Sequence, residues 1–270
     1  MPTVKVRDIN MYYEIHGEGE PLVLICGLGV DLSCWSSVIA EFSRGYKVIT
    51  FDNRGSGRTD APDVPYSIEM LADDTAGLLD ALGIGKAHIL GHSLGSFIAQ
   101  ELALKYPHKI KSLTLASSST HLTNAVKHII KTWDKLFQEG VSLENRLRES
   151  LPWLMTKNFF AAPNAVEKAV SFLMSNPHPQ SLHGMTHQTN ACLDHDTLDR
   201  IHQISAPTLV IVGRQDLLMT IRMSKELAAG IPHAELVILK GGAHDLCGEI
   251  PDKFRMAVLD FLAKVDNTPK

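Results

Sequence analysis

The stretch that decides the fold is Gly91-His92-Ser93-Leu94-Gly95, which follows the apolar run 87–90 and precedes the helical pattern 96–104. A strand that turns at once into a helix brings the two backbones together, and a glycine on either side of the serine leaves room for that approach. The serine hydroxyl then stands at the carboxyl end of a strand, above a helix N-terminus whose free amides favour negative charge. The spacing therefore predicts a nucleophile elbow.

Short apolar runs recur along the chain and alternate with helical patterns. The first strand candidates, 4–7 and 11–15, alternate apolar and polar residues, which is typical of a half-exposed antiparallel hairpin at a sheet edge. Later strand candidates are apolar throughout, as strands buried on both faces of a parallel sheet are, and lie at 22–26, 48–51, 88–90, 113–116, 208–212 and 236–239. Helical patterns occur at 68–82, 96–106, 221–229 and 252–263. The alternation predicts an α/β fold with a doubly wound, mostly parallel sheet.

The alternation is interrupted between about residues 118 and 205. Only helical patterns occur there, at 125–139, 143–151 and 165–174, and the turn-rich Asn176-Pro177-His178-Pro179 divides the region. A separate helical domain is one interpretation and an insertion is the other. Strand–helix alternation resumes at residue 206 with too little chain left for an independent sheet, which favours the insertion. We therefore expect a core of residues 1–117 and 206–270, with residues 118–205 inserted as a helical cap.

Composition limits the classes of function. The 270 residues are 44% hydrophobic with a formal net charge of −4, which suits a globular unit and offers no basic surface for nucleic acid. The cysteines have neither metal-site spacing nor a compact disulfide framework, so reduced thiols are expected at Cys26, Cys34, Cys192 and Cys247. The first residues lack a signal-peptide apolar segment, and no stretch is long enough to span a bilayer. We expect a cytoplasmic protein without membrane or nucleic-acid partners.

Two further residues fit the chemistry of an activated serine. A serine becomes an efficient nucleophile when a base removes its proton and a third group orients that base. His244 follows strand candidate 236–239, and Asp216 follows 208–212, so both lie at carboxyl ends of parallel strands, where Ser93 is also expected. The chain order serine, aspartate, histidine is the order that elbow chemistry uses. Ser93, Asp216 and His244 are the predicted catalytic residues.

Other acids and histidines have more ordinary interpretations. Asp216 also fits a helix N-cap. Asp194, Asp196 and Asp199 precede strand candidate 208–212 and are weaker candidates for the acid, whereas Asp245 fits a cap or loop acid. Most of the 13 histidines are expected on the surface or in the core.

Acyl transfer also needs hydrogen-bond donors aimed at the developing oxyanion. The backbone amide of Leu94, directly after Ser93, is one candidate. The loop Cys26-Gly27-Leu28-Gly29 follows strand candidate 22–26 and offers the amide of Leu28 as the second. The alternative, a dinucleotide-binding loop, lacks the third glycine and the later acidic residue of that fingerprint. Leu28 and Leu94 are therefore the predicted oxyanion-hole residues, and no cofactor is expected.

Several blocks of sequence occur together in a fixed order. They are residues 51–60 (FDNRGSGRTD), 91–95 (GHSLG), 207–216 (PTLVIVGRQD) and 241–244 (GGAH). Together they resemble the α/β-hydrolase superfamily over nearly the whole chain, and residues 118–205 correspond to its variable cap. Within the superfamily the spacing is similar to 3-oxoadipate enol-lactonases and related small carboxylesterases. The resemblance implies the same triad and oxyanion roles.

The chain departs from such relatives beside the site. Many of them carry His-Gly where this chain has Cys26-Gly27, which changes the side chain that braces the loop and leaves the backbone donor. A serine at position 93 argues against haloalkane dehalogenases and epoxide hydrolases, which use aspartate there. Leu94 replaces the methionine that often follows the serine in cofactor-free haloperoxidases, which weakens a peroxide-dependent function.

Two sets of polar residues favour structural roles. Asp52 and Arg54 are expected to hold the loop after strand candidate 48–51 rather than to contact substrate. No nearby carboxylate or cysteine completes a convincing metal-ligand spacing with His183, His187 and His195, so no metal is predicted.

Bulky residues of the expected cap admit two interpretations. Trp133, Trp153, Phe159 and Phe160 would line an apolar acyl pocket if they face the elbow, and would form the core of the cap otherwise. Because isolated short helices need an apolar surface to pack against, we expect the cap to cover the site and to set the acyl size.

These features predict a serine hydrolase that cleaves a small ester or lactone through a Ser-His-Asp triad and an acyl-enzyme. Two alternatives stay open. The same triad would serve hydrolytic carbon–carbon cleavage of a β-diketone-like substrate, and some members of the superfamily are ligand-sensing signalling proteins with slow turnover. Sequence does not separate them because the cap determines the substrate. The expected partner is a small-molecule ester or lactone, and the oligomeric state is left open.

Overall fold

A single sheet organises the computed structural model, which describes residues 2–268. Its eight strands have the order β1-β2-β4-β3-β5-β6-β7-β8. The hairpin of β1 and β2 is antiparallel and lies at one edge, and the pairs from β4 to β8 are parallel. Each strand candidate coincides with one of the strands, and the predicted α/β fold is confirmed. The strands are β1 (Thr3–Val6), β2 (Ile9–His16), β3 (Glu20–Ile25), β4 (Tyr46–Phe51), β5 (Ala87–His92), β6 (Ile110–Ala116), β7 (Thr208–Gly213) and β8 (Glu235–Leu239).

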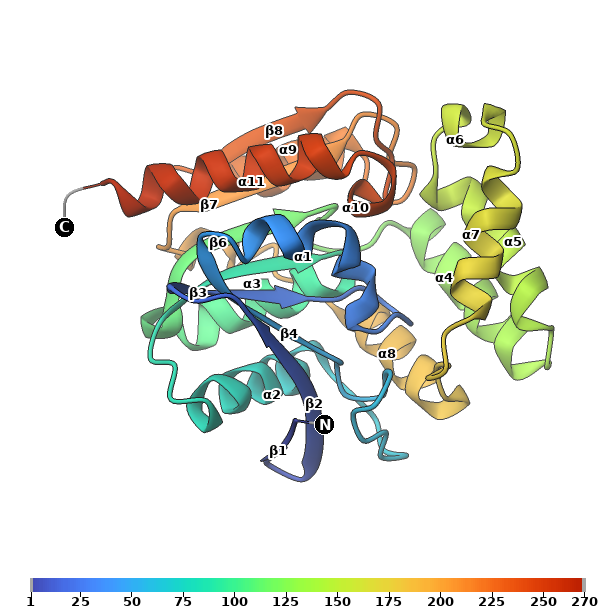
Figure 1. Cartoon of the computed structure of the whole chain (residues 1–270), viewed down its shortest axis with the longest axis horizontal. Helices are drawn as coiled ribbons and strands as arrows, with labels where there is room; N and C mark the ends of the chain where they lie inside the picture. The colour runs from blue at the N-terminus through green and yellow to red at the C-terminus, as the bar shows by residue number, and fades with distance from the viewer. Residues whose placement is uncertain (1, 269–270) are drawn as a thin grey trace.

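Helices cover both faces of the sheet (Figure 1). One face carries α1 and α11, which pack together, and the other carries α2 and α3, with α9 packed on β7 and β8. Within residues 2–268 no helix combines the length and the apolar content that a membrane crossing requires. The helices that accompany the sheet are α1 (Ser36–Phe42), α2 (Ile68–Ala81), α3 (Leu94–Lys105), α9 (Ile221–Gly230), α10 (Leu246–Glu249) and α11 (Pro251–Asp266).

Side chains of the buried strands alternate between two apolar cores. In β3, Val23 and Ile25 belong to the core under α2 and α3, whereas Leu22 and Leu24 belong to the core under α1 and α11. Strands that are buried on both faces need apolar residues at every position, which explains their continuous apolar runs.

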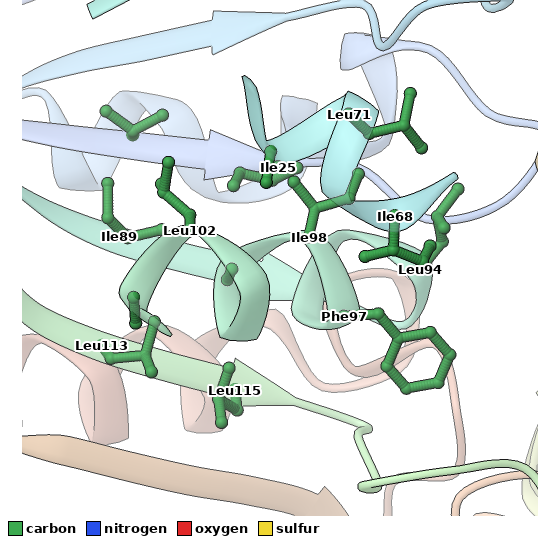
Figure 2. Packing of buried hydrophobic residues seen from close by; sticks show 14 of the residues in the cluster. Ile25, Ile68, Leu71, Ile89, Leu94, Phe97, Ile98, Leu102, Leu113 and Leu115 are labelled. Atoms are coloured by element: carbon green, nitrogen blue, oxygen red, sulfur yellow. The ribbon is translucent and has the colours of Figure 1, made fainter. Parts of the chain in front are cut away.

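The helix after the elbow is held firmly in the first core. Figure 2 shows Leu94, Phe97, Ile98 and Leu102 of α3 among side chains of the sheet and of α2. All four are at most 1% exposed. Because burial of such a side chain contributes about 1.5–3 kcal/mol, α3 is a stable base for the residue that precedes it.

Between β6 and β7 the described chain forms helices and one isolated bridge, His121–Asp196. In Figure 1 helices α4 to α7 lie beyond the ends toward which the parallel strands point. α4, α5 and α7 coincide with predicted helical patterns, and α6 and α8 were not predicted. α6 is little more than one turn. The buried residues of α8 are Gly184, Gln188 and Thr189 in its first part and Ala191, Cys192 and Leu193 only near its end, so an apolar helical period is short. These helices are α4 (Asn124–Gln138), α5 (Leu143–Leu154), α6 (Lys157–Ala161), α7 (Ala165–Met174) and α8 (Leu182–Asp194).

Candidate active site

Ser93 lies on the turn between β5 and α3 in a strained backbone conformation. Its φ is 54° and its ψ is −121°, backbone angles that residues other than glycine rarely adopt. A Cβ on Gly91 would lie 2.1 Å from the carbonyl oxygen of Gly95, and one on Gly95 would lie 2.1 Å from that of Ile25. Both positions are therefore closed to any larger residue, and the predicted close approach of strand and helix is confirmed.

The structure brings the three predicted catalytic residues together. Nε2 of His244 lies 3.0 Å from Oγ of Ser93, and Nδ1 of His244 lies 3.0 Å from Oδ2 of Asp216. When Nδ1–H donates to the carboxylate, Nε2 is left to accept the serine proton. His244 is 4% exposed and Asp216 is 5% exposed, so little water competes for these hydrogen bonds.

Asp216 is fixed by the loop that follows β7. Its Oδ1 accepts hydrogen bonds from the backbone amides of Leu218 and Met219, at 2.9 and 2.8 Å. A carboxylate held by two amides and an imidazole has one preferred orientation, which in turn orients His244.

The other acids considered at the sequence level lie elsewhere. Asp194, Asp196 and Asp199 are exposed near the end of α8, and within residues 2–268 none of them hydrogen-bonds His244. Asp245 caps α10, where its carboxylate accepts a hydrogen bond of 2.9 Å from an amide of the first turn. The interpretation of Asp245 as a cap residue is confirmed.

The loop after β3 lies against Ser93. A Cβ on Gly27 would lie 3.4 Å from Cβ of Ser93, and Leu28 and Leu94 border the same cavity as the serine. Within the described residues, neither Leu28 nor Leu94 donates its backbone amide to another protein group. The Leu94 amide is also the first of α3, at the positive end of the helix dipole. Two free amides of this kind are what an oxyanion hole requires.

Cys26 and its neighbours brace this loop. Its Sγ donates to the carbonyl of Asp31 at 3.4 Å, and Nδ2 of Asn53 donates to the carbonyl of Cys26 at 3.0 Å. These contacts hold the loop that carries the amide of Leu28.

Gln188 of α8 is a residue that the sequence reasoning missed. It is fully buried, its Oε1 accepts from the amide of Gly29 at 3.2 Å, and its Nε2 donates to the carbonyl of Arg54 at 2.7 Å. The contact joins a cap helix to the loop that carries Leu28. A lone glutamine in a mixed helical pattern carries no sequence signal for this role.

The loop that carries His244 is held by the end of α5. The amides of His244 and Asp245 donate to the carbonyl of Leu154 at 3.0 and 3.2 Å. Glu249 accepts from the amide and the hydroxyl of Thr156, both at 2.8 Å, and with its other oxygen from the amide of Ala243 at 2.9 Å. Because Leu154 and Thr156 lie about 90 residues before their partners in the histidine loop and α10, no local motif predicts these contacts.

His92 holds the loop that carries His244. Its Nε2 donates to the carbonyl of His244 at 2.9 Å, and the hydroxyl of Ser117 donates to the same oxygen at 3.1 Å. Burial lowers the pKa of His92, and the neighbouring His244 ring lowers it further. A neutral His92 therefore holds the loop by a hydrogen bond and adds no charge beside His244.

The predicted structural role of Asp52 and Arg54 is confirmed. Arg54 is 1% exposed and binds Asp74 at 2.7 Å and Asp8 at 2.6 Å. The guanidinium of Arg54 lowers the pKa of Asp8 to about 2. Asp52 accepts hydrogen bonds from two backbone amides, at 2.8 and 2.9 Å, and neither side chain borders the cavity above Ser93.

A cavity of about 580 Å³ lies above Ser93, and cap helices form much of its wall. Of the four bulky cap residues, two fit the pocket interpretation, and the exposed Phe160 fits neither interpretation. Trp133 and Phe159 line this cavity, whereas Trp153 borders a separate hollow of about 370 Å³ and Phe160 is 43% exposed. An acyl group above Ser93 would therefore meet some of these aromatic rings and not others.

The cap histidines have separate partners. Nε2 of His183 lies 2.7 Å from a backbone carbonyl, Nε2 of His187 lies 2.8 Å from Asp63, and His195 is buried in a stacked contact with Phe97. Among the described residues no group of three or more His, Cys, Asp or Glu side chains is placed to share a metal ion.

Comparison with known proteins places the chain in a family. Residues 20–250 match the family described as alpha/beta hydrolase fold. The chain therefore belongs to the α/β-hydrolase family, and it is an enzyme of the hydrolase class.

Similar proteins are hydrolases of carbonyl compounds. The chain is 30% identical over 268 residues to RutD of Azorhizobium caulinodans, a candidate carbamate hydrolase. The match includes 98% of this chain and all of that protein. Among solved structures it is similar to the enol-lactonase of Burkholderia xenovorans LB400, with 27% identity, a TM-score of 0.88 and coverage of 97% and 100%. A thermophilic esterase from Thermogutta terrifontis shows 26% identity, a TM-score of 0.87 and coverage of 98% and 99%.

Proposed function

We propose that this protein is a serine hydrolase of small esters or lactones. Ser93 is the nucleophile, His244 is the general base and Asp216 orients and stabilises the histidine. The proposal rests on two contacts of 3.0 Å, one between Oγ of Ser93 and Nε2 of His244 and the other between Nδ1 of His244 and Oδ2 of Asp216. The enol-lactonase and the esterase named above support the substrate class.

The reaction proceeds through an acyl-enzyme. Oγ of Ser93 attacks the substrate carbonyl while Nε2 of His244 takes its proton, and the amides of Leu28 and Leu94 stabilise the oxyanion. His244 then protonates the leaving alcohol, which departs from an ester and stays tethered to the acyl group in a lactone. Water attacks the acyl-enzyme with His244 again as base, which releases the carboxylic acid and restores Ser93.

Carbamate hydrolysis is the second candidate, because RutD matches 98% of the chain at 30% identity. A carbamate presents the same carbonyl to Ser93 and differs in the atoms bound to it. The same residues would form the oxyanion and the covalent intermediate.

The test compares purified protein on short- and long-chain nitrophenyl esters, a lactone and a carbamate. Ser93→Ala should abolish turnover and labelling by a fluorophosphonate probe, while the exposed Ser171→Ala should retain both. Labelling that persists in Ser93→Ala would identify another nucleophile. A carbamate preferred over every ester and lactone would move the substrate class, and tight binding with negligible turnover would favour a sensor.

A further inference from the structure

One side of α5 faces the cavity above Ser93. Its cavity-lining residues recur every three or four positions, as one face of a helix does. They are Leu143, Arg146, Leu147, Ser150, Leu151 and Leu154. Arg148 lies outside this stripe and binds Glu144 at 2.9 Å and Glu167 at 3.5 Å. Arg146 is therefore a cation on a face that is otherwise mostly leucine.

Arg146 has protein partners for only part of its guanidinium. Nε donates to the carbonyl of Val141 at 3.1 Å, and the guanidinium carbon lies 3.6 Å from the centroid of the Phe137 ring. Within residues 2–268 its terminal nitrogens donate to no protein group, and no carboxylate forms an ion pair with it. Burial lowers the pKa of Arg146, yet a guanidinium stays protonated at neutral pH.

The acids that border the same cavity are already engaged. Asp31 accepts from Asn176 at 2.9 Å, Asp245 caps α10, and Glu249 accepts from Thr156. Arg146 is the one lysine or arginine among the described residues that line the cavity. A partly buried cation without an anion is costly, and a ligand that supplies the anion removes that cost.

We propose that Arg146 binds a carboxylate carried by the acyl part of the substrate. The inference rests on the proposed function, since it places the scissile carbonyl at Ser93 and the second charge at Arg146 in one cavity. A planar guanidinium with two free terminal nitrogens matches a carboxylate through two parallel hydrogen bonds. The Phe137 ring and the Val141 carbonyl hold the guanidinium plane in place for that contact. The substrate class is then an ester or lactone whose acid portion carries a further ionised carboxyl group.

The kinetic test uses two acyl groups of equal length and different charge. Mono-4-nitrophenyl glutarate carries a terminal carboxylate, and 4-nitrophenyl valerate does not. Wild-type protein should prefer the glutarate ester, and Arg146→Met should lower its kcat/KM about 10- to 100-fold, mainly through KM, with valerate turnover nearly unchanged. Arg146→Lys should retain part of the preference, and Arg148→Met is the matched control on the exposed side of α5.

Equal losses on both esters in Arg146→Met would assign the residue a structural role and overturn the inference. So would a wild-type enzyme that shows no preference for the charged ester. Arg146→Lys serves as the second variant if Arg146→Met does not fold.

A binding measurement separates this inference from the catalytic proposal. Calorimetric titration of Ser93→Ala with glutarate needs no turnover, and the added Arg146→Met change should abolish the binding. Glutarate binding that depends on Arg146 in a protein without esterase activity would overturn the proposed reaction and keep the carboxylate site. Esterase activity with no Arg146-dependent glutarate binding would do the reverse.

Discussion

The two walls of the cavity are built in different ways. On the sheet side, His244, Asp216 and the glycines around Ser93 are buried. The Ser93 hydroxyl, the His244 ring and the Asp216 carboxylate each have a defined partner. On the cap side, α6 buries none of its residues and α7 buries only Val170. The sheet wall is rigid because it belongs to the main core, whereas α6 and α7 add at most one buried residue to the support of the cap wall.

The difference separates chemistry from substrate choice. Proton transfer and oxyanion stabilisation require groups held within about half an ångström, which regular elements at a sheet edge provide. The size and charge of an acyl group can be read by side chains that pack more loosely. The largest effects of substitution should therefore come from the sheet wall and the smallest from the cap wall.

The largest effect is expected from substitution of Asp216, the acid on the sheet wall of the cavity. Asp216→Asn keeps the shape of the side chain and removes the anion, which misorients the imidazole and destabilises its charged form. We expect kcat on a short nitrophenyl ester to fall by a factor of about 10²–10⁴. Asp196→Asn is the control, since Asp196 is exposed in the cap region. A nearly silent Asp216→Asn beside a large loss in Asp196→Asn would move the acid into the cap.

A second prediction concerns the junction between the two walls, where His195 follows α8. Its ring stacks on Phe97 with centroids 4.3 Å apart, and burial lowers its pKa to about 3. The unfolded chain, with an ordinary histidine pKa near 6.5, then binds more protons than the folded chain between about pH 6.5 and 3. The free energy of unfolding should fall as pH decreases through that window, by about 2 kcal/mol between pH 6.5 and 5.

His195→Phe should remove this part of the acid sensitivity and keep the stacked contact. Urea unfolding at pH 7 and pH 5 measures it, with the same substitution at the exposed His128 as the control. An unchanged pH dependence in His195→Phe would mean that the ring is already charged in the folded protein.

The smallest expected effects lie in the cap wall. Trp133→Ala and Phe159→Ala enlarge the cavity, so kcat/KM for long-chain nitrophenyl esters should rise up to about tenfold while that for the shortest ester changes little. Phe160→Ala is the matched control, because Phe160 is exposed beside Phe159. An equal loss of kcat/KM for esters of every chain length would mean that these rings position the reacting groups. The proposed difference between the two walls would then be wrong.

The close approach of Ser93, His244 and Asp216 could be predicted because each of these residues follows a local pattern. Ser93 is marked by its two glycines, and Asp216 and His244 each follow a buried strand. The roles of Gln188 and Glu249 could not be predicted, since Gln188 accepts from the amide of Gly29 and Glu249 from that of Thr156, both distant in sequence. Nor does sequence tell which side of a helix faces a cavity, so Trp133 and Trp153 looked equivalent until α4 and α5 were placed.

The carbonyl of Leu154 and the Thr156–Glu249 contact have a consequence for protein engineering. A cap exchanged as a cassette between residues 118 and 205 would carry away the acceptor for two amides of the histidine loop. The recipient protein would then gain a new cap wall for its cavity and lose the carbonyl that holds the loop of its own His244. A chimera that retains residues 154–156 from the recipient keeps that anchor, which makes the end of α5 the practical crossover point for cap grafting.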